Sequence, residues 1–170
     1  AVDYAPLPAV ADIESAVAPG APAVWPDCPD NISFVEEKGD AAAVDAAFTK
    51  ADHIVRQKMV INRVTAVAME PRGCLGDYDS RQDRYTLYTG LQNPHPLRYQ
   101  IARQVFDIPE TSVRVIPGDV GGSFGMRGGT YNELVLVLWA SRLVGRPVKW
   151  RCDRSEGFMS DTHGRDNVSD

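Results

Sequence analysis

The chain has 170 residues, and its 18 Lys and Arg against 23 Asp and Glu give a formal net charge of −5. With 44% hydrophobic and 24% charged residues, the composition is that of a globular domain large enough to bury a core. The acidic balance argues against a nucleic-acid partner, because neutralising phosphates requires clustered Lys and Arg. No apolar run of about 18 residues is present, so the sequence predicts no transmembrane segment.

The number and spacing of the cysteines indicate whether the protein lies in a reducing or an oxidising cellular compartment. Cys28, Cys74 and Cys152 lie far apart, and no pair has the C-x-x-C spacing. An odd, dispersed set is typical of free thiols in a reducing environment. We therefore expect a cytoplasmic protein without disulfides, in which each cysteine packs as a small apolar side chain.

The first 35 residues contain six of the twelve prolines. Proline fixes φ and removes a backbone donor, so residues 1–35 are predicted to form an extended arm, with a helical turn or two in Ala9–Ala16. Residues 36–170 carry the pattern of a folded domain.

Within this domain, hydrophobic periodicity predicts alternating helices and strands. Asp40 is a suitable N-cap for the first helix. Pro96 suits the first turn of a second helix, whose buried face is Leu97, Ile101 and Val105. The predicted elements are, in order, helix Ala41–Ala51, strand His53–Ile61, strands Gly73–Tyr78 and Arg84–Thr89, the Pro96 helix, and strand Ser112–Ile116.

A glycine-rich loop follows the last of these strands, since six of the twelve residues in Gly118–Gly129 are glycine. The next helix, from Tyr131 or the residue before it to about Val144, is apolar almost all round, which predicts a buried helix. Gly145 ends that helix, and Val148–Arg151 forms another strand. The alternation predicts an α/β (α+β) fold with a mixed sheet and packed helices.

The glycine loop has a chemical use. Glycines allow positive φ and a close approach of the backbone to a ligand, so several N–H groups can point at one anion. The spacing matches neither G-x-G-x-x-G followed by an acidic residue about 20 positions later nor G-x-x-x-x-G-K-[ST]. The loop is therefore either a ligand-binding backbone or a turn that lets a strand and a helix pack closely.

Gln92 is a second candidate, because it lies between a predicted strand and a predicted helix, where its carboxamide can donate to an oxo or carbonyl oxygen. The alternative is an ordinary polar connection in which Asn93 or His95 caps the helix. No zinc site is predicted, because metal-ligand spacing is absent from the three histidines, His53, His95 and His163.

Five motifs together resemble one family, the molybdopterin-binding large subunits of the xanthine dehydrogenase, aldehyde oxidase and carbon monoxide dehydrogenase group of molybdenum hydroxylases. The resemblance covers nearly all of the chain, and its most specific part is the G-G-x-F-G loop about thirty residues after Gln92. It implies that residues 1–35 leave a preceding hammerhead domain and that residues 36–170 are the N-terminal part of a molybdopterin-binding domain, truncated on its C-terminal side. The motifs are M-E-P-R-G at 69–73, L-Y-T at 87–89, Q-N-P-H at 92–95, D-V-G-G-S-F-G at 119–125, and G-R-P-V-K-W with D-R-S-E between 145 and 156.

The resemblance also implies a cofactor site. The family's glutamine at the molybdenum oxo ligand corresponds to Gln92, which with Phe124 would lie near the metal. An amide donor beside an oxo group stabilises developing charge. Ser123 stands where many members have a third glycine, so its φ must suit a residue with a side chain. The family's loop against the oxo group and the pterin corresponds to Gly121, Gly122, Ser123, Phe124 and Gly125.

Two departures limit what the resemblance implies. Purine-oxidising members have a substrate-binding glutamate where this chain has Gly128, and the nearest carboxylate, Glu133, falls on the following helix. An aldehyde-like or heterocyclic substrate, or carbon monoxide, is therefore expected. The family's catalytic glutamate lies beyond Asp170, so no catalytic residue is expected within this chain.

The resulting hypothesis is a segment of an oxidoreductase that supplies one wall of a molybdopterin site, with the cytosine dinucleotide form of the cofactor. Alone, the chain is expected to bind no cofactor and to be inactive. Its partners would be the remainder of the molybdenum subunit, iron–sulfur and FAD-containing subunits or domains, and a small-molecule substrate. Glu70 and Arg72 are either supports behind the site or members of ion pairs. The alternative hypothesis is a non-enzymatic module whose glycine loop binds an anion, serves assembly or simply packs.

Overall fold

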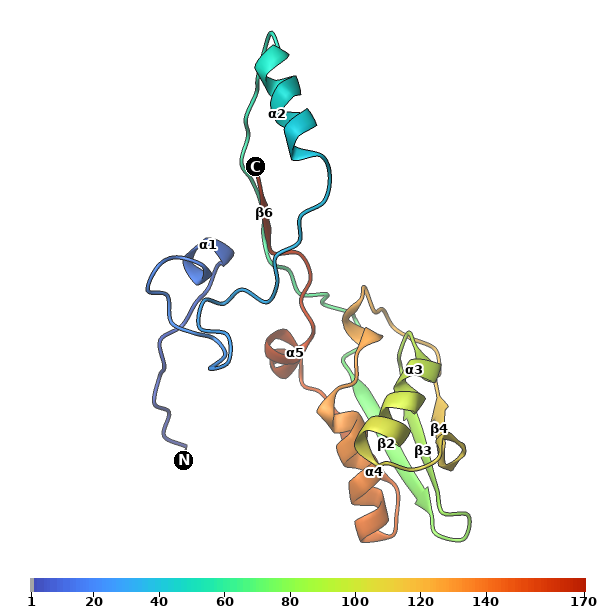
Figure 1. The fold of residues 1–170 in the computed structure, drawn as a ribbon. Helices are drawn as coiled ribbons and strands as arrows, with labels where there is room; N and C mark the ends of the chain where they lie inside the picture. Colours follow the sequence, from blue (N-terminus) through green and yellow to red (C-terminus); the bar gives the residue numbers. More distant parts are fainter. Residues whose placement is uncertain (1) are drawn as a thin grey trace. The chain divides into compact units, whose positions relative to one another are not determined.

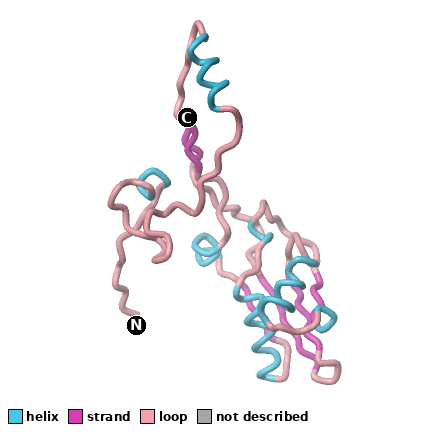
Figure 2. The backbone as a smooth tube through the Cα atoms, viewed as in Figure 1, coloured by secondary structure: helices cyan, strands magenta, loops and turns pink. Residues whose placement is uncertain are grey.

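The structure, a computed structural model, describes residues 2–170 and forms two compact units. One unit consists of residues 2–63 with 165–170, and the other of residues 64–164 (Figure 1). The boundary between residues 35 and 36 remains a prediction of the sequence. Figure 2 shows the helices and strands in chain order: α1 Ile13–Ala16, α2 Ala41–Lys50, β1 Met59–Ile61, β2 Gly73–Asp79, β3 Arg84–Thr89, α3 Pro94–Tyr99, η1 Gln100–Val105, η2 Glu110–Ser112, β4 Val113–Ile116, η3 Met126–Gly128, α4 Asn132–Val144, β5 Val148–Arg151, α5 Arg154–Ser160 and β6 Asn167–Ser169.

In the first unit, none of the described residues is buried. Its helix α2 begins where the sequence predicts, and the Asp40 carboxylate accepts a hydrogen bond from the Ala43 backbone at 2.9 Å. The predicted strand His53–Ile61 is wrong in its first part. Only Met59–Ile61 is a strand, because the short β6 offers it three pairing partners and residues before Met59 have none.

The second unit is a four-stranded sheet with helices packed on it. The strand order is β4-β3-β2-β5, in which β3 is parallel to β4 and the other pairs are antiparallel. This arrangement confirms the predicted mixed sheet with packed helices. The predicted strands are also confirmed, with small shifts at Asp79 and Val113. Helix α4 packs along β2 and β5, and α3 lies beside β4 (Figure 1).

Alternate strand residues build the core, as the two-residue period of a strand requires. The register places Cys74 opposite Thr89 and Tyr78 opposite Tyr85, so these side chains share the face that the helices cover. The ring of Tyr85 stacks on Phe106 at 5.0 Å between centroids. The buried apolar side chains of this core include Cys74, Tyr85, Leu87, Leu97, Ile101, Val113, Leu134, Val137 and Leu138.

The Pro96 helix differs from its prediction at one buried position. Leu97 and Ile101 are buried, but Val105 is 49% exposed. The chain becomes π-helical after Tyr99, and the Phe106 N–H donates to the Ile101 carbonyl at 3.0 Å. These wider turns rotate Val105 away from the face that Leu97 and Ile101 share.

Helix α4 is buried on one side only. Leu134, Val137 and Leu138 face the sheet, whereas Leu136 and Trp139 are more than half exposed. The prediction of burial all round is therefore wrong for the described residues, because the sheet covers a single face of the helix. The helix ends at Gly145 as predicted, with the left-handed φ of +65°. Among residues 2–170, no helix has both the length and the apolar character needed to cross a membrane.

Candidate cofactor-binding site

Gln92 and the glycine loop leave the sheet at the same edge. Strands β3 and β4 are parallel, with Tyr88 opposite Ile116, so their carboxyl ends lie together. Gln92 stands three residues after the end of β3, and the loop Gly118–Gly129 follows β4. The parallel pair thus unites two segments far apart in the sequence. Ligands of open α/β sheets bind outside the carboxyl ends of strands, which makes this edge the candidate site.

Gln92 lies in the connection between β3 and α3, as predicted. Its backbone N–H donates to the Arg127 carbonyl at 3.3 Å. Its side-chain oxygen is 3.8 Å from the position a Cβ would take on Gly128. The alternative in which Asn93 caps the helix is wrong, because Asn93 holds the N-cap position without a side-chain capping bond. The exposed Gln92 side chain therefore faces the glycine loop.

Four consecutive backbone amides of the loop are unpaired in the part of the chain that the structure describes. Among the described residues, nothing accepts a hydrogen bond from the backbone N–H groups of residues 122–125. Gly122 and Gly125 have φ of +104° and +97°, which favours glycine. Ser123 avoids positive φ, as expected for a residue with a side chain. Phe124 has φ of +51°, an unusual conformation for a bulky residue, and is 80% exposed.

Gly121 is anchored differently from the rest of the loop. Its N–H donates to Glu70 Oε2 at 2.8 Å, and its carbonyl accepts from the Glu70 N–H at 3.2 Å. A Cβ at this position would stand 2.5 Å from the Glu70 Cβ, so the close approach requires glycine. The donors that the loop offers to a ligand are therefore those of residues 122–125.

Arg127, which lies within the loop, was not among the site residues predicted from the sequence. Its side chain is 2% exposed, and its Nε donates to the Gly122 carbonyl at 2.9 Å. Nη1 donates to the Gly90 carbonyl at 3.2 Å, and Nη2 pairs with Glu70 Oε2 at 3.0 Å. The available signal was a single cation in a loop that is half glycine. A cation among small residues can turn inward, where it needs carbonyl and carboxylate partners.

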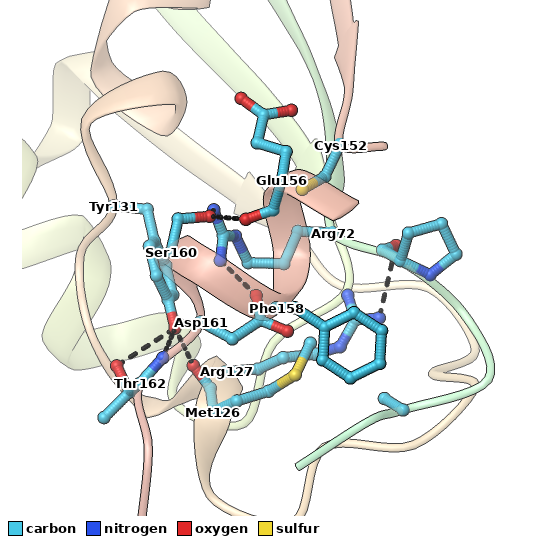
Figure 3. A network of polar contacts seen from close by, with 12 residues as sticks. Arg72, Met126, Arg127, Tyr131, Cys152, Glu156, Phe158, Ser160, Asp161 and Thr162 are labelled. Carbon is cyan, nitrogen blue, oxygen red and sulfur yellow. Dashed lines mark hydrogen bonds and ion pairs between the residues drawn. The ribbon is translucent and has the colours of Figure 1, made fainter. Parts of the chain in front are cut away.

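Arg72 is the other buried arginine of the polar network in Figure 3, and its partners differ from those of Arg127. Its Nε donates to Glu133 at 2.8 Å, its Nη1 pairs with Asp161, and its guanidinium carbon lies 3.8 Å from the Tyr131 ring centroid. Burial lowers the pKa of Arg72, but the hydrogen bond and charge of Glu133, with the charge of Asp161, raise it overall. Of the two open interpretations, Arg72 fits the ion pair, which ties the first turn of α4 to β2. Glu70 fits both interpretations, because it pairs with Arg127 and accepts from the Gly121 N–H of the glycine loop.

The donor set at this edge fits an oxygen-rich ligand. It consists of four backbone N–H groups and one carboxamide, beside open space. No atom lies within 4 Å of a Cβ position at Gly118, Gly125 or Gly129. Unpaired backbone amides of a glycine-rich loop can bind the oxygens of phosphate or metal-oxo groups. Among residues 2–170, no three His, Cys, Asp or Glu side chains are grouped to hold a metal ion directly. The fold and the site thus define a mixed-sheet domain with a glycine-rich loop whose unpaired amides suit an oxygen-rich ligand.

Comparison with known proteins identifies the family. Residues 24–170 match the molybdopterin cofactor-binding domain, and the chain belongs to this family. The chain is 36% identical over 168 residues to the 6-hydroxypseudooxynicotine dehydrogenase complex subunit gamma of Paenarthrobacter nicotinovorans, covering 98% of this chain and 20% of that protein. It is 35% identical over 177 residues to the carbon monoxide dehydrogenase large chain of Hydrogenophaga pseudoflava, covering 97% and 22%. The structure of reconstituted CO dehydrogenase from Oligotropha carboxidovorans matches with a TM-score of 0.84 and 31% identity, over 96% of this chain and 22% of that one.

The family expected from the motifs is thus confirmed, together with its α/β fold. The chain spans about a fifth of the length of the curated relatives it matches. The roles of Gln92 and of residues 121–125 toward a cofactor remain predictions.

Proposed function

We propose that this chain forms one wall of a molybdopterin site in an oxidoreductase that hydroxylates an aldehyde-like or heterocyclic substrate, or oxidises carbon monoxide. The observation that carries the proposal is that Gln92 contacts the glycine loop at Arg127 and Gly128, at the sheet edge from which the loop leaves, and that the same loop holds the four unpartnered amides of residues 122–125. Membership of the molybdopterin cofactor-binding family supports it.

In this proposal each residue has a limited task. The Gln92 carboxamide donates to an oxo oxygen of the bound group, and the amides of residues 122–125 donate to its other oxygens. The exposed Phe124 ring covers the group and excludes water. When bound, the cofactor supplies the redox chemistry, and the protein supplies orientation and fixed dipoles. Donors fixed before the reaction stabilise developing charge without reorganisation.

The proposed substrate class follows from the absence of a glutamate at position 128 of this wall. At Gly128, where purine-oxidising members of the family have a glutamate, the chain has no side chain, and Glu133 instead pairs with Arg72 at 2.8 Å. Neither position 128 nor Glu133 therefore offers a free carboxylate for binding a purine ring. The names of two relatives, a 6-hydroxypseudooxynicotine dehydrogenase subunit and a carbon monoxide dehydrogenase chain, support a heterocyclic substrate or carbon monoxide.

The partners are proposed on the same basis. The relatives are named as a complex subunit and a large chain, and this chain matches about a fifth of each. We place the remaining cofactor contacts, a cytosine dinucleotide form of the pterin and the catalytic base on sequence that corresponds to the rest of those proteins. Iron–sulfur and FAD-containing modules would carry the electrons away.

The test uses the protein purified with its native partners. Molybdenum measured by mass spectrometry and pterin measured by fluorescence are both expected at one per chain. Gln92→Leu removes the amide donor and keeps the volume, so turnover of the substrate should fall about 100-fold while the molybdenum content stays. Gln104→Leu, at an exposed position of η1, is the matched control and should leave turnover unchanged.

A native preparation that lacks both molybdenum and pterin would contradict the proposal. It would favour the alternative, a module whose glycine loop binds another anion or only packs. Equal turnover in the Gln92→Leu and Gln104→Leu variants would leave the family assignment intact but would exclude the proposed role of Gln92.

A further inference from the structure

We propose that Arg127 is the positioning residue of this site, and that its buried guanidinium holds the glycine loop, the Gln92 segment and Glu70 in one fixed arrangement. The inference rests on the proposed function for the identity of the ligand. For the arrangement itself, it rests only on contacts within residues 64–164.

The guanidinium joins three segments that are distant in the sequence. It donates to the carbonyls of Gly122, five residues away, and Gly90, 37 residues away. It also donates to the carbonyl of Glu70, 57 residues away, at 2.7 Å, and to the carboxylate of the same residue at 3.0 Å. These bonds use all three guanidinium nitrogens. A single planar group therefore fixes the distances between the loop, the end of β3 and the segment before β2.

The main chain of Arg127 adds to this role. Its carbonyl accepts the Gln92 N–H at 3.3 Å, and its own N–H donates to Ser123 Oγ at 3.3 Å. Arg127 thus contacts the residue that would donate to the bound group and a residue whose amide would do the same. The Ser123 hydroxyl supplies an acceptor that a glycine at this position would lack.

Glu70 completes the arrangement by balancing the buried charge. Its Oε2 accepts from Arg127 Nη2 and also from the Gly121 N–H at 2.8 Å. A buried guanidinium is costly unless it is paired, and this is the ion pair that the described residues give Arg127. The carboxylate therefore links the charge of Arg127 directly to the start of the glycine loop.

Neighbouring glycines make room for the guanidinium. A Cβ on Gly90 would stand 3.0 Å from Arg127 Nη1, tighter than ordinary contact. Lysine cannot replace the group, because one ammonium presents three N–H bonds from a single point, whereas the guanidinium presents five in a planar fork. Arg127→Lys keeps the positive charge but removes the planar set of N–H donors. This variant therefore tests the hydrogen-bond geometry separately from the charge.

The test compares Arg127→Lys with Arg72→Lys in the protein purified with its native partners. Arg72 is the matched control, because it is an equally buried arginine of the same unit, held by Glu133, Asp161 and Ser160. Three quantities are measured: the thermal midpoint, the hydrogen exchange of amides in 90–93 and 118–129, and the content of molybdenum and pterin. A purely structural role would lower the midpoint alone.

Both variants should lower the thermal midpoint. Only Arg127→Lys should raise amide exchange in the two segments about tenfold or more, and only this variant should lower cofactor content, also about tenfold. Equal exchange and equal cofactor content in the two variants would overturn the proposal. If the unmodified protein carries no cofactor, the proposed function fails, and the exchange comparison still decides whether Arg127 holds the loop against Gln92. If Arg127→Lys does not fold, Glu70→Gln, which keeps an acceptor and removes the charge, is compared with Glu133→Gln by the same measurements.

Discussion

Gly76 of β2 lies against the main chain of Val137 in α4, and a Cβ on Gly76 would stand 2.6 Å from the Val137 carbonyl carbon. Strand and helix thus touch through their backbones at this point. The contact fixes the distance between α4 and the sheet. Because the helix is rigid, it also fixes the position of Glu133 in the first turn. Arg72, directly before β2, contacts Glu133 and Tyr131 at the start of the same helix.

Gly76→Ala should therefore lower the free energy of unfolding by about 1–3 kcal/mol, because the added methyl group must push α4 away from the sheet. Gly73→Ala is the control in the same strand, since its Cβ would lie 3.6 Å from the Trp150 carbonyl oxygen, an ordinary contact. This control should change the free energy by less than about 1 kcal/mol. Urea denaturation of both variants makes the measurement. Equal losses would show that the close contact at Gly76 does not govern stability.

Local sequence signals predicted the four strands of the larger sheet, the Asp40 cap and the end of α4, because each depends on neighbouring residues. Asp40 caps a helix through an amide three residues away, and Gly145 ends one through its own φ. The exposure of Val105 could not be predicted, because the π-helical turn before it departs from the regular helical period. The partial exposure of α4 depends on which faces the sheet covers, and no local pattern records this.

The residues of the candidate site also divide into those that local sequence predicts and those that depend on contacts between distant segments. The glycine loop and Gln92 stand out locally as a loop rich in glycine and as a polar residue between elements. Arg127 and Glu70 form their pair across 57 residues, and the parallel pairing of β3 with β4 brings the loop to the Gln92 segment. A contact between residues 57 positions apart leaves no pattern in either sequence segment. Arg127, which joins the parts of the site, could therefore be identified only from the structure.

Cys74 should be unreactive in the folded protein. Burial, with a smaller contribution from the charge of Glu133, raises its pKa to about 12 from 9.0. The thiolate is the nucleophile, so iodoacetamide at pH 8 should modify the partly exposed Cys28 and spare Cys74. Between pH 9 and 12, only the unfolded chain releases this proton. The contribution to stability is therefore complete below pH 9 and is lost as the pH rises through this window. Peptide mass spectrometry detects the labels, and rapid labelling of Cys74 in folded protein would contradict its burial.

Asp161→Asn should destabilise the second unit by about 2 kcal/mol, because it leaves the buried Arg72 with one carboxylate in place of two. Glu110→Gln is the control, since it breaks the ion pair with Arg98, in which both side chains are more than a third exposed. Such pairs contribute less than about 1 kcal/mol. Thermal and urea unfolding of the two variants are compared. A loss as small for Asp161→Asn as for Glu110→Gln would mean that Glu133 alone balances Arg72.

Phe124→Gly should raise the free energy of unfolding by about 1 kcal/mol, because it relieves a left-handed φ of +51° and removes a side chain that is 80% exposed. The same variant should lower cofactor content, because the ring no longer covers the bound group. Asp107→Gly is the matched control, with the same φ of +51° at an exposed position away from the loop. It should gain less stability, since Asp tolerates this conformation better, and should leave cofactor content unchanged. A stable Phe124→Gly variant with full cofactor content would exclude a role for the ring.

The 170-residue chain by itself should retain no pterin and oxidise no substrate. The wall it provides offers four free amides and one carboxamide, and each hydrogen bond contributes about 0.5–1.5 kcal/mol net where water competes. Immobilising a ligand costs on the order of 4–15 kcal/mol, which a few bonds on an open surface do not offset. The exposed apolar residues of α4, among them Leu136 and Trp139, should instead promote self-association, which sedimentation measures. The decisive experiment incubates residues 1–170 with released molybdenum cofactor, removes the unbound fraction and measures molybdenum and pterin fluorescence. Stoichiometric retention would show that this wall alone suffices, and that the cofactor needs no second side to its cavity.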